Sequence, residues 1–282
     1  MRRLLLGLIG AGIQRSRTPA LHECEAAAHN MHCLYQLVDL EQLGLTVAAL
    51  PDLLLAAERM GFRGLNITHP CKQAVMPLLT DVSDDARALG AVNTVVIRDG
   101  RRFGHNTDWR AFFEALRIGL PEVSLRCIAQ MGAGGGGSAT AYAALKLGAG
   151  HINLVDLDPE RSTAAAARLN RVFGEGKASA CRDAAEALSG ADGLIHATPT
   201  GMFGHSELPF PRVLLRRELW VAEIVYFPLE TELLRLARSI GCRTMDGSRM
   251  AVGQAFEAFR LFTGVEADAA RMQRHFLAMT EA

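Results

Sequence analysis

Lysine is scarce in this sequence, and net charge is absent. Only three of the 30 basic residues are lysines, Lys72, Lys146 and Lys177, and 30 acidic residues balance the basic ones. A chain without excess positive charge has no electrostatic footprint for nucleic acid, so nucleic-acid partners are not expected. Because arginine is the default basic residue, each lysine needs a specific explanation.

Long apolar runs and cysteine motifs are also missing. The apolar stretches are only as long as a strand, as in residues 4–9, so no membrane-spanning helix is expected. The N-terminus reaches glycine and charge too early for a signal peptide, and a cytoplasmic protein is expected. The six cysteines have no Cys-x-x-Cys spacing, which excludes the usual zinc and redox motifs. No metal site is expected.

Short β-branched runs alternate with longer helical segments along the chain. This pattern is typical of an α/β fold with mostly parallel sheets, and 282 residues predict two domains, the second beginning near residue 108. Expected strands are residues 4–9, 33–38, 64–68, 126–131, 152–155, 193–197 and 219–225, with a hairpin of 92–98 and 101–105. Expected helices are residues 18–30, 50–60, 70–79, 83–89, 109–119, 138–147, 159–173, 231–240, 249–263 and 267–279, and 200–211 is an expected loop.

The strongest motif is a run of glycines between an expected strand and an expected helix. Gly132, Gly134 and Gly137 satisfy G-x-G-x-x-G, where a tight turn lets the backbone approach a pyrophosphate. Amides at the start of the helix then face the phosphate charge. Asp156 lies 19 residues past Gly137, after the next strand, where an acid meets a ribose 2′-hydroxyl. The combination predicts a dinucleotide site.

Asp156 also indicates which dinucleotide is bound. A carboxylate accepts hydrogen bonds from a free 2′-hydroxyl and repels the extra phosphate of NADP, so NAD is the expected cofactor. The neighbouring Leu157 and Asp158 supply no cation, and Arg161 is expected within the following helix. A second sequence, Gly10-Ala11-Gly12, has Arg15 in place of the third glycine and is interpreted as a structural turn.

Four polar segments lie at expected strand ends or loops in the first half of the chain. They are residues 16–19, 66–72, 91–94 and 106–108, and they offer hydroxyls and amides suited to a polyhydroxy carboxylate. Lys72 is the reactive candidate, because a buried lysine can transfer a proton, and Asp108 is its natural partner. The structural alternatives are a solvated lysine and a helix N-cap, and Asn66 and Asn93 alone would more often be turn residues.

Together these segments resemble the shikimate/quinate dehydrogenase family. Seven segments match the family in order: residues 16–19, 66–72, 90–94, 104–108, 197–202, 225–234 and 247–254. The resemblance implies a split substrate domain, residues 1–108 completed by helices in 247–282, and a Rossmann NAD-binding domain of residues 109–246. It implies a proton-transferring pair, Lys72 and Asp108, that accepts the hydroxyl proton as hydride leaves for the nicotinamide.

The resemblance also implies the residues that line the two ligands. The expected substrate-binding residues are Ser16, Thr18, Asn66, Thr68, Asn93, Tyr226 and Gln254. The expected cofactor-binding residues are Gly132, Ala133, Gly134, Gly135, Gly136, Asp156, Leu157, Arg161, Thr198, Ile224, Gly247 and Met250.

Several residues depart from the pattern of the biosynthetic enzymes of the family. Thr18 stands where a second serine is common, and Asp156-Leu157-Asp158 replaces an Asn-Arg-Thr that holds NADP. His196 replaces an asparagine, and Glu223 replaces an aspartate. The cofactor-side changes resemble the NAD-using quinate/shikimate branch, and NAD favours catabolic oxidation over the reduction that serves aromatic biosynthesis.

The function expected from the sequence is therefore NAD-dependent oxidation of a ring hydroxyl of quinate or shikimate. An aminated analogue as substrate, a non-catalytic NAD sensor and a folate-type methylene dehydrogenase are the alternatives. The partner is a small polyhydroxy carboxylate, and the chain is expected to be a monomer or a homodimer.

Overall fold

The computed structural model describes residues 2–204 and 207–280 and divides the chain into two compact units. Unit 1 comprises residues 1–107 and 254–282, and unit 2 comprises Asp108–Gly253. The sequence placed the second boundary at 246/247, but the first turns of the helix Ser248–Thr263 belong to unit 2, where a Cβ on Gly253 would lie 3.1 Å from that of Ala111. Residues 205–206 of the expected loop 200–211, and the expected domain ends 1 and 281–282, lie outside the described residues.

Unit 1 is built around a mixed six-stranded sheet with the order β2-β1-β3-β5-β6-β4. Strands β1, β2 and β3 are parallel, β5 runs antiparallel to both β3 and β6, and β4 pairs with β6 in parallel. The bounds are β1 (Arg2–Gly10), α1 (Thr18–Ala28), β2 (Met31–Asp39), α2 (Leu50–Arg59), β3 (Gly64–Ile67), α3 (Cys71–Ala74), β4 (Asp81–Val82), α4 (Asp84–Leu89), β5 (Thr94–Arg98), β6 (Arg101–His105), α10 (Ser248–Thr263, its second half) and α11 (Ala269–Thr280).

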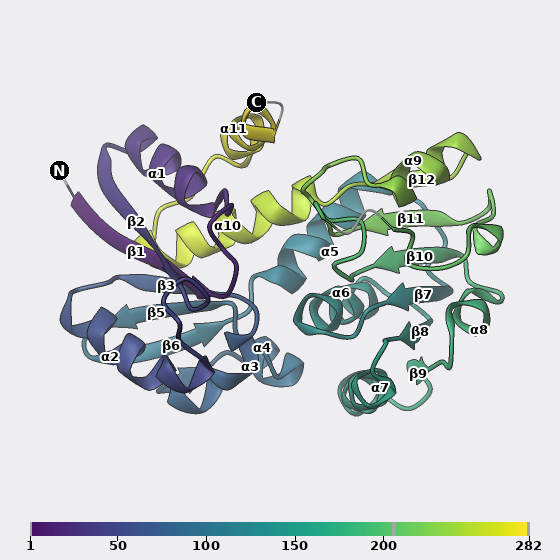
Figure 1. Cartoon of the computed structure of the whole chain (residues 1–282), viewed down its shortest axis with the longest axis horizontal. Helices are drawn as coiled ribbons and strands as arrows, with labels where there is room; N and C mark the ends of the chain where they lie inside the picture. The colour runs from purple at the N-terminus through teal and green to yellow at the C-terminus, as the bar shows by residue number, and fades with distance from the viewer. Residues whose placement is uncertain (1, 205–206, 281–282) are drawn as a thin grey trace. The chain divides into compact units, whose positions relative to one another are not determined.

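Two apolar cores cover the two faces of this sheet. Leu6 and Leu8 of β1 share one core with Phe262 of α10, whereas Ile9 shares the other with Leu54 of α2. This alternation follows from the two-residue period of a strand. Figure 1 shows α2, α3 and α4 on one side of the sheet and α10 on the other.

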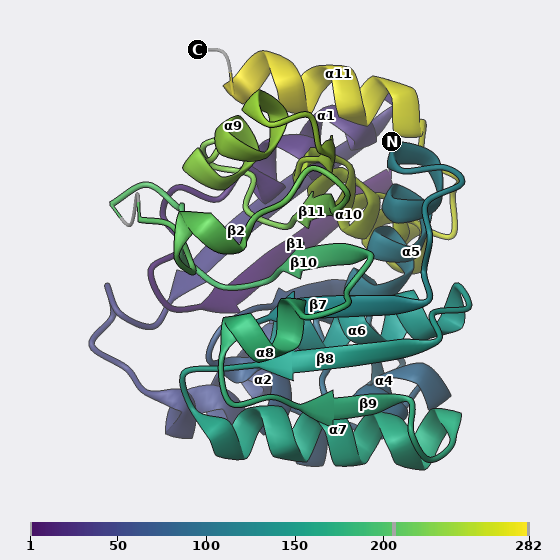
Figure 2. The ribbon, with the colours of Figure 1, turned by 90° about the vertical axis from the view of Figure 1, so that its right-hand side faces the viewer.

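Unit 2 is built around a fully parallel sheet with the order β12-β11-β10-β7-β8-β9. Figure 2 shows β10, β7, β8 and β9 side by side. This is the doubly wound arrangement of a Rossmann fold, in which the chain reverses its direction of winding between β7 and β10. The bounds are α5 (Asp108–Gly119), β7 (Cys127–Met131), α6 (Gly135–Lys146), β8 (His151–Val155), α7 (Pro159–Phe173), β9 (Ala178–Ala180), α8 (Ala184–Leu188), β10 (Gly193–His196), β11 (Trp220–Glu223), α9 (Glu232–Ser239) and β12 (Arg243–Met245).

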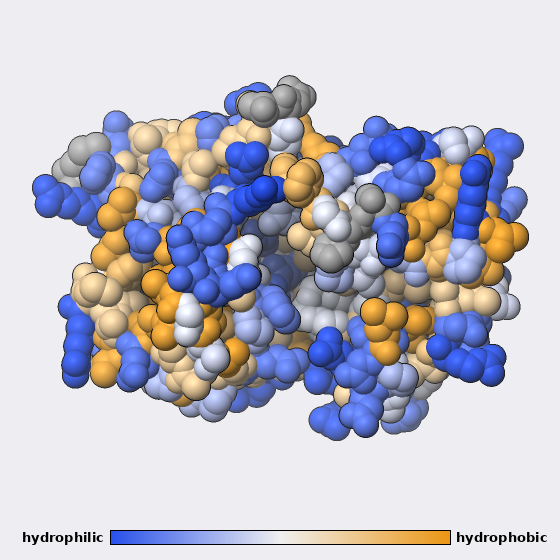
Figure 3. All heavy atoms as spheres, in the orientation of Figure 1, coloured by the Kyte–Doolittle hydropathy of each residue, from blue (hydrophilic) through white to orange (hydrophobic). Residues whose placement is uncertain are grey.

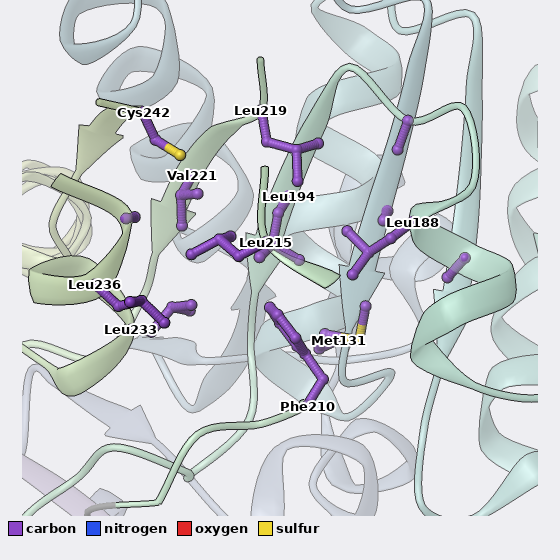
Figure 4. Close-up of a cluster of buried hydrophobic side chains, with 14 of the residues drawn as sticks. Met131, Leu188, Leu194, Phe210, Leu215, Leu219, Val221, Leu233, Leu236 and Cys242 are labelled. Carbon is purple, nitrogen blue, oxygen red and sulfur yellow. The ribbon is translucent and has the colours of Figure 1, made fainter. Parts of the chain in front are cut away.

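One core of unit 2 lies between the sheet and the helices α8 and α9. Met131, Leu194 and Val221 point from three neighbouring strands into this cluster, and Leu188 and Leu233 meet them from the helices (Figure 4). On the face that Figure 3 shows, hydrophilic residues are spread over both units and apolar residues form smaller separate areas.

The structure corrects several details of the expected elements. The helix expected over 70–79 is two pieces, α3 and the 3-10 turn Met76–Leu78, because Pro77 lacks an amide proton to continue the first. The strand expected over 219–225 ends at Glu223, and the first hairpin strand begins at Thr94. Asp108 is the first residue of α5 rather than a residue preceding it. Four short elements, β4, α8, β9 and β12, were not expected.

Candidate functional site

The parallel sheet of unit 2 gathers the expected cofactor-binding residues at one edge. Met131, Val155, His196 and Glu223 end their strands in register, so the residues that follow each strand emerge at the same edge. Ligands of doubly wound sheets bind outside the carboxyl ends of the strands, where the winding reverses. In this unit that position lies between β7 and β10. The residues that follow β7, β8, β10, β11 and β12 include, in this order, Gly132, Asp156, Thr198, Ile224 and Gly247.

The glycine loop after β7 is too tight for side chains at two positions. A Cβ on Gly132, which has φ +98°, would lie 2.4 Å from the carbonyl oxygen of Ala197, and a Cβ on Gly137 would lie 2.2 Å from that of Gly132. The buried amide of Gln130 donates to the carbonyls of Gly132 and Gly137, both at 2.8 Å. The loop is therefore fixed from inside the unit.

The same loop is open on its outer side. A Cβ on Gly134, the N-cap of α6, would meet no atom within 4 Å, and one on Gly136 would meet only Ile224, at 3.1 Å. The first amides of a helix have no acceptor within the helix, so the start of α6 presents donors to this open space. The backbone is thus compatible with a pyrophosphate at this loop, and the role of Gly132 to Gly136 in binding it stays a prediction.

Asp156 stands directly after β8, beside this loop. Its Oδ2 accepts a hydrogen bond from the Ala133 amide at 2.7 Å, and its Oδ1 accepts one from the Asp158 amide at 3.0 Å. Leu157 points fully into solvent. Arg161, on the first turn of α7, forms an ion pair with Asp158, Nε to Oδ2 at 3.3 Å. The arginine nearest to Asp156 in the sequence is therefore paired with a different carboxylate, that of Asp158.

The turn of residues 10–12 in unit 1 uses an acid in a similar way but more completely. Asp39 ends β2, and its Oδ1 accepts from the amides of Gly12 (2.9 Å) and Glu41 (3.1 Å). Its Oδ2 accepts from the amide of Ile13 (3.0 Å) and the side chain of Gln14 (3.1 Å). Four bonds use the four acceptor positions of a carboxylate, so this acid has a structural role. Asp156 accepts only two bonds from the residues that the structure describes.

Two departures from the family pattern form a buried pair. His196 ends β10, Glu223 ends β11, and both are fully buried. Nδ1 of His196 lies 2.8 Å from Oε2 and 2.9 Å from Oε1 of Glu223, while Nε2 lies 2.5 Å from the hydroxyl of Thr198. The sequence marked both residues but not their pairing, which depends on strand register.

The remaining cofactor-side positions lie close together in unit 2. A Cβ on Gly247 would lie 2.5 Å from the carbonyl oxygens of both Ile224 and Val225, so this glycine allows the chain after β12 to approach that after β11. Met250, on the first turn of α10, is buried. Ile224 faces the glycine loop through Gly136. The expected cofactor-binding residues of this edge therefore come from the ends of five strands and from the start of α10.

Tyr226 and Asp108 interact within unit 2. Tyr226 lies after β11 and is 39% exposed, yet desolvation raises the pKa of its phenol, and the negative charge of Asp108 raises it further. Asp108 is itself buried. An expected substrate-binding residue and an expected catalytic residue thus share one electrostatic environment.

Polar residues of unit 1 gather at the carboxyl ends of its parallel strands. Because β5 is antiparallel, its first residue, Thr94, pairs with Asn66 near the end of β3 and with His105 at the end of β6. Asn93 Oδ1 accepts from the Thr107 amide at 2.8 Å, and its Nδ2 donates to the Thr107 hydroxyl at 2.9 Å. These bonds fix the segment that leads into Asp108.

Asn66 is held on both sides. Its Oδ1 accepts from the Tyr35 hydroxyl at 2.7 Å, and its Nδ2 donates to the Thr94 hydroxyl at 3.2 Å. These bonds connect β3 with β2 and β5, which is a structural role. A role for Asn66 as a substrate ligand stays a prediction, as it does for Thr68, which follows β3 directly.

Lys72, Ser16, Thr18 and Gln254 complete the expected residues of unit 1. Lys72 is half-buried on α3, and its carbonyl accepts from the Val92 amide at 2.9 Å, which joins α3 to the segment of Asn93. Ser16 accepts from the Thr18 amide at 3.3 Å at the start of α1. The carbonyl of Gln254 accepts from the Thr107 hydroxyl at 3.1 Å.

No helix in residues 2–204 and 207–280 is long and apolar enough to cross a membrane. The same residues contain no group of three or more His, Cys, Asp or Glu side chains that could hold a metal ion.

Known families match both ends of the chain. Residues 8–95 match the shikimate dehydrogenase substrate binding domain, and residues 247–275 match the shikimate 5′-dehydrogenase C-terminal domain. These segments contain Lys72 and Gln254, respectively.

Similar proteins cover nearly the whole chain. A shikimate dehydrogenase (NADP(+)) of Streptomyces avermitilis is 54% identical over 95% of this chain and 93% of its own. A quinate/shikimate dehydrogenase (NAD(+)) of Corynebacterium efficiens is 47% identical over 98% of each chain. The structure of quinate dehydrogenase from Corynebacterium glutamicum in complex with NAD superposes with a TM-score of 0.92 at 45% identity, covering 99% of this chain and 100% of that one. The chain belongs to the shikimate dehydrogenase family of nicotinamide dinucleotide-dependent oxidoreductases.

Proposed function

We propose that this protein is an NAD-dependent dehydrogenase that oxidises a ring hydroxyl of quinate or shikimate. The observation that carries the choice of NAD is Asp156, which stands beside the glycine loop with acceptor capacity left after its bonds to Ala133 and Asp158. A ribose 2′-hydroxyl can donate to such a carboxylate, whereas a 2′-phosphate would meet its negative charge. Arg161, which could offset that charge, is paired with Asp158.

The relatives support the activity and divide on the cofactor. The names of the Corynebacterium proteins give quinate or shikimate as the substrate and NAD as the cofactor, whereas the name of the Streptomyces relative gives NADP. The local chemistry at Asp156 is therefore the basis for our choice. None of the relatives given above is named for an aminated substrate or as a sensor, so the comparisons do not favour either alternative.

The substrate chemistry is assigned to the expected catalytic and substrate-binding residues. When bound, a nicotinamide would supply the acceptor for the hydride that leaves the carbinol carbon. Lys72 takes the hydroxyl proton in oxidation and returns it in reduction, with Asp108 as its partner in the proton transfer. The substrate's hydroxyls and carboxylate bind to Ser16, Thr18, Asn66, Thr68, Asn93, Tyr226 and Gln254. The first unit is the substrate domain and the second is the cofactor domain.

Absorbance at 340 nm tests the proposal. Quinate and shikimate would each be offered with NAD and with NADP, and NADH or NADPH formation recorded over substrate and cofactor concentration. We expect kcat/KM for NAD to exceed that for NADP with at least one of the two acids. A preference for NADP with both acids would overturn the cofactor assignment, and no turnover with either acid would overturn the substrate class.

A further inference from the structure

The hydrogen-bond partners of His196 differ between its two ring nitrogens. Three donors converge on Glu223: His196 Nδ1, the Val225 amide at 3.0 Å and the Thr231 hydroxyl at 3.2 Å. The Thr231 hydroxyl also accepts from the Leu234 amide at 3.2 Å, so its proton is free for Glu223. Glu223 therefore acts as an acceptor, and Nδ1 of His196 carries a proton.

The other ring nitrogen then controls Thr198. In the tautomer that carries its one proton on Nδ1, the imidazole presents Nε2 as an acceptor, and the Thr198 hydroxyl, 2.5 Å away, donates its proton there. The Thr198 oxygen accepts from the Thr200 amide at 3.2 Å. With these two bonds made, one acceptor position on that oxygen is left by the described residues, and its proton is already donated.

Thr198 stands at the point where the sheet reverses its winding. A Cβ on Gly132 would lie 3.0 Å from the Thr198 methyl group, so the threonine borders the glycine loop. Asp156 follows β8, on one side of β7, and Thr198 follows β10, on the other side. If Asp156 holds the adenosine ribose, the nicotinamide half of the cofactor extends over β10 and β11.

We propose that the buried His196–Glu223 pair sets the Thr198 hydroxyl as a hydrogen-bond acceptor for a donor group on the nicotinamide half of the dinucleotide. Phosphate oxygens are acceptors and do not suit this hydroxyl, whereas a ribose hydroxyl or the carboxamide N–H does. His196 and Glu223 are positioning residues that act through Thr198. The inference rests on the proposed dinucleotide site but not on the identity of the acid.

Binding of NADH to the enzyme without substrate, followed by fluorescence, tests this inference. Thr198→Val keeps the shape of the side chain and removes the oxygen, and should weaken NADH binding roughly five- to tenfold. Glu223→Gln is nearly isosteric, but its amide donates to Nδ1, so the ring proton moves to Nε2 and the Thr198 hydroxyl becomes a donor. This variant should weaken NADH binding to a similar extent.

The double variant and two controls separate a positioning role from general damage. If Glu223 acts through Thr198, E223Q/T198V should bind NADH no more weakly than T198V alone. Binding of 5′-AMP, which lacks the nicotinamide half, should be unchanged in all three variants. Thr263→Val removes another buried hydroxyl, bonded to the Phe259 carbonyl at 2.7 Å in unit 1, and should leave NADH binding unchanged.

Three results would overturn the inference. They are wild-type NADH affinity in T198V, additive losses in the double variant, and an equal loss of 5′-AMP binding. The titrations would be repeated with NADPH, and the inference concerns whichever dinucleotide binds more tightly. An enzyme that prefers NADPH would thus contradict the proposed cofactor without affecting this test.

Discussion

The imidazole of His22 stacks on the phenol ring of Tyr35, with the two ring centroids 5.1 Å apart. Phe259 and Phe262 of α10 border the same imidazole, which is fully buried. Neither ring nitrogen has a hydrogen-bond partner among the described residues. Desolvation lowers the pKa of His22 to about 3, against the opposing charge of Glu25. The folded protein therefore holds this ring in its neutral form.

This neutral histidine should make the protein less stable in mild acid. In the unfolded chain His22 binds a proton near pH 6.5, whereas in the folded chain it does so only near pH 3. The contribution of neutral His22 to the unfolding free energy is therefore complete above pH 6.5 and is lost as the pH falls toward 3. Between pH 7.5 and 5 this residue should account for about 2 kcal/mol of lost unfolding free energy.

His22→Phe isolates that contribution, because a phenyl ring has no proton to bind. Urea unfolding at both pH values should show a smaller pH dependence in the variant, and any packing offset cancels in the difference. An identical pH dependence in both proteins would contradict the neutral assignment.

Two glycines of the same loop should respond differently to alanine. Gly137→Ala places a Cβ 2.2 Å from a backbone oxygen and should lower both stability and NADH affinity. Gly134→Ala meets no protein atom and its φ of −70° suits alanine, so it should preserve the melting temperature. It should nevertheless weaken NADH binding, because the methyl group stands in the open space assigned to the pyrophosphate. Wild-type affinity in G134A would place the pyrophosphate elsewhere.

Asp156 should control cofactor choice. Asp156→Ala removes the ribose acceptor together with the bond to Ala133, and should lower kcat/KM for NAD about 10- to 100-fold. Asp156→Asn keeps one oxygen for Ala133 and removes the negative charge, so it should gain relative activity with NADP. Steady-state kinetics with both cofactors measures the ratio, and an unchanged ratio in D156N would remove the electrostatic argument.

Lys72 should matter for turnover and not for cofactor binding. Lys72→Ala removes the proton acceptor and should lower kcat by roughly 10²- to 10⁴-fold. NADH binding should stay at the wild-type value, because Lys72 belongs to unit 1 and the glycine loop to unit 2. Lys177→Ala is the matched control among the three lysines, and its kcat should be unchanged. Turnover of K72A near that of K177A would refute the assignment.

The sequence predicts the long elements of this fold and misses the short ones. Runs such as residues 4–9 and 152–155 are apolar enough to indicate a buried strand, and Asp99-Gly100 marks a hairpin turn. β4, β9 and β12 span only two or three residues, too few to show a period, and tertiary pairing alone makes them strands. An element can therefore be predicted from the sequence when it is long enough to show a periodic pattern of apolar residues.

The site divides along similar physical lines. Glycines and an acid at fixed spacing predict a loop, because a tight turn has few local solutions. His196 and Glu223 are 27 residues apart in the sequence, and only the register of β10 against β11 brings them together. The sequence around Asn66 likewise does not indicate that its side-chain amide forms hydrogen bonds with Tyr35 and Thr94.

Asp39 and Asp156 differ in how many of their acceptor positions are occupied, and this difference bears on how a ligand changes the melting temperature. Asp39 is saturated by its own turn, so its contribution to stability is already complete in the empty protein. Asp156 has half of its capacity uncommitted by the described residues. A dinucleotide that donates to it adds bonds found only in the folded state, so the melting temperature should rise with dinucleotide concentration, and less steeply once Asp156 is changed.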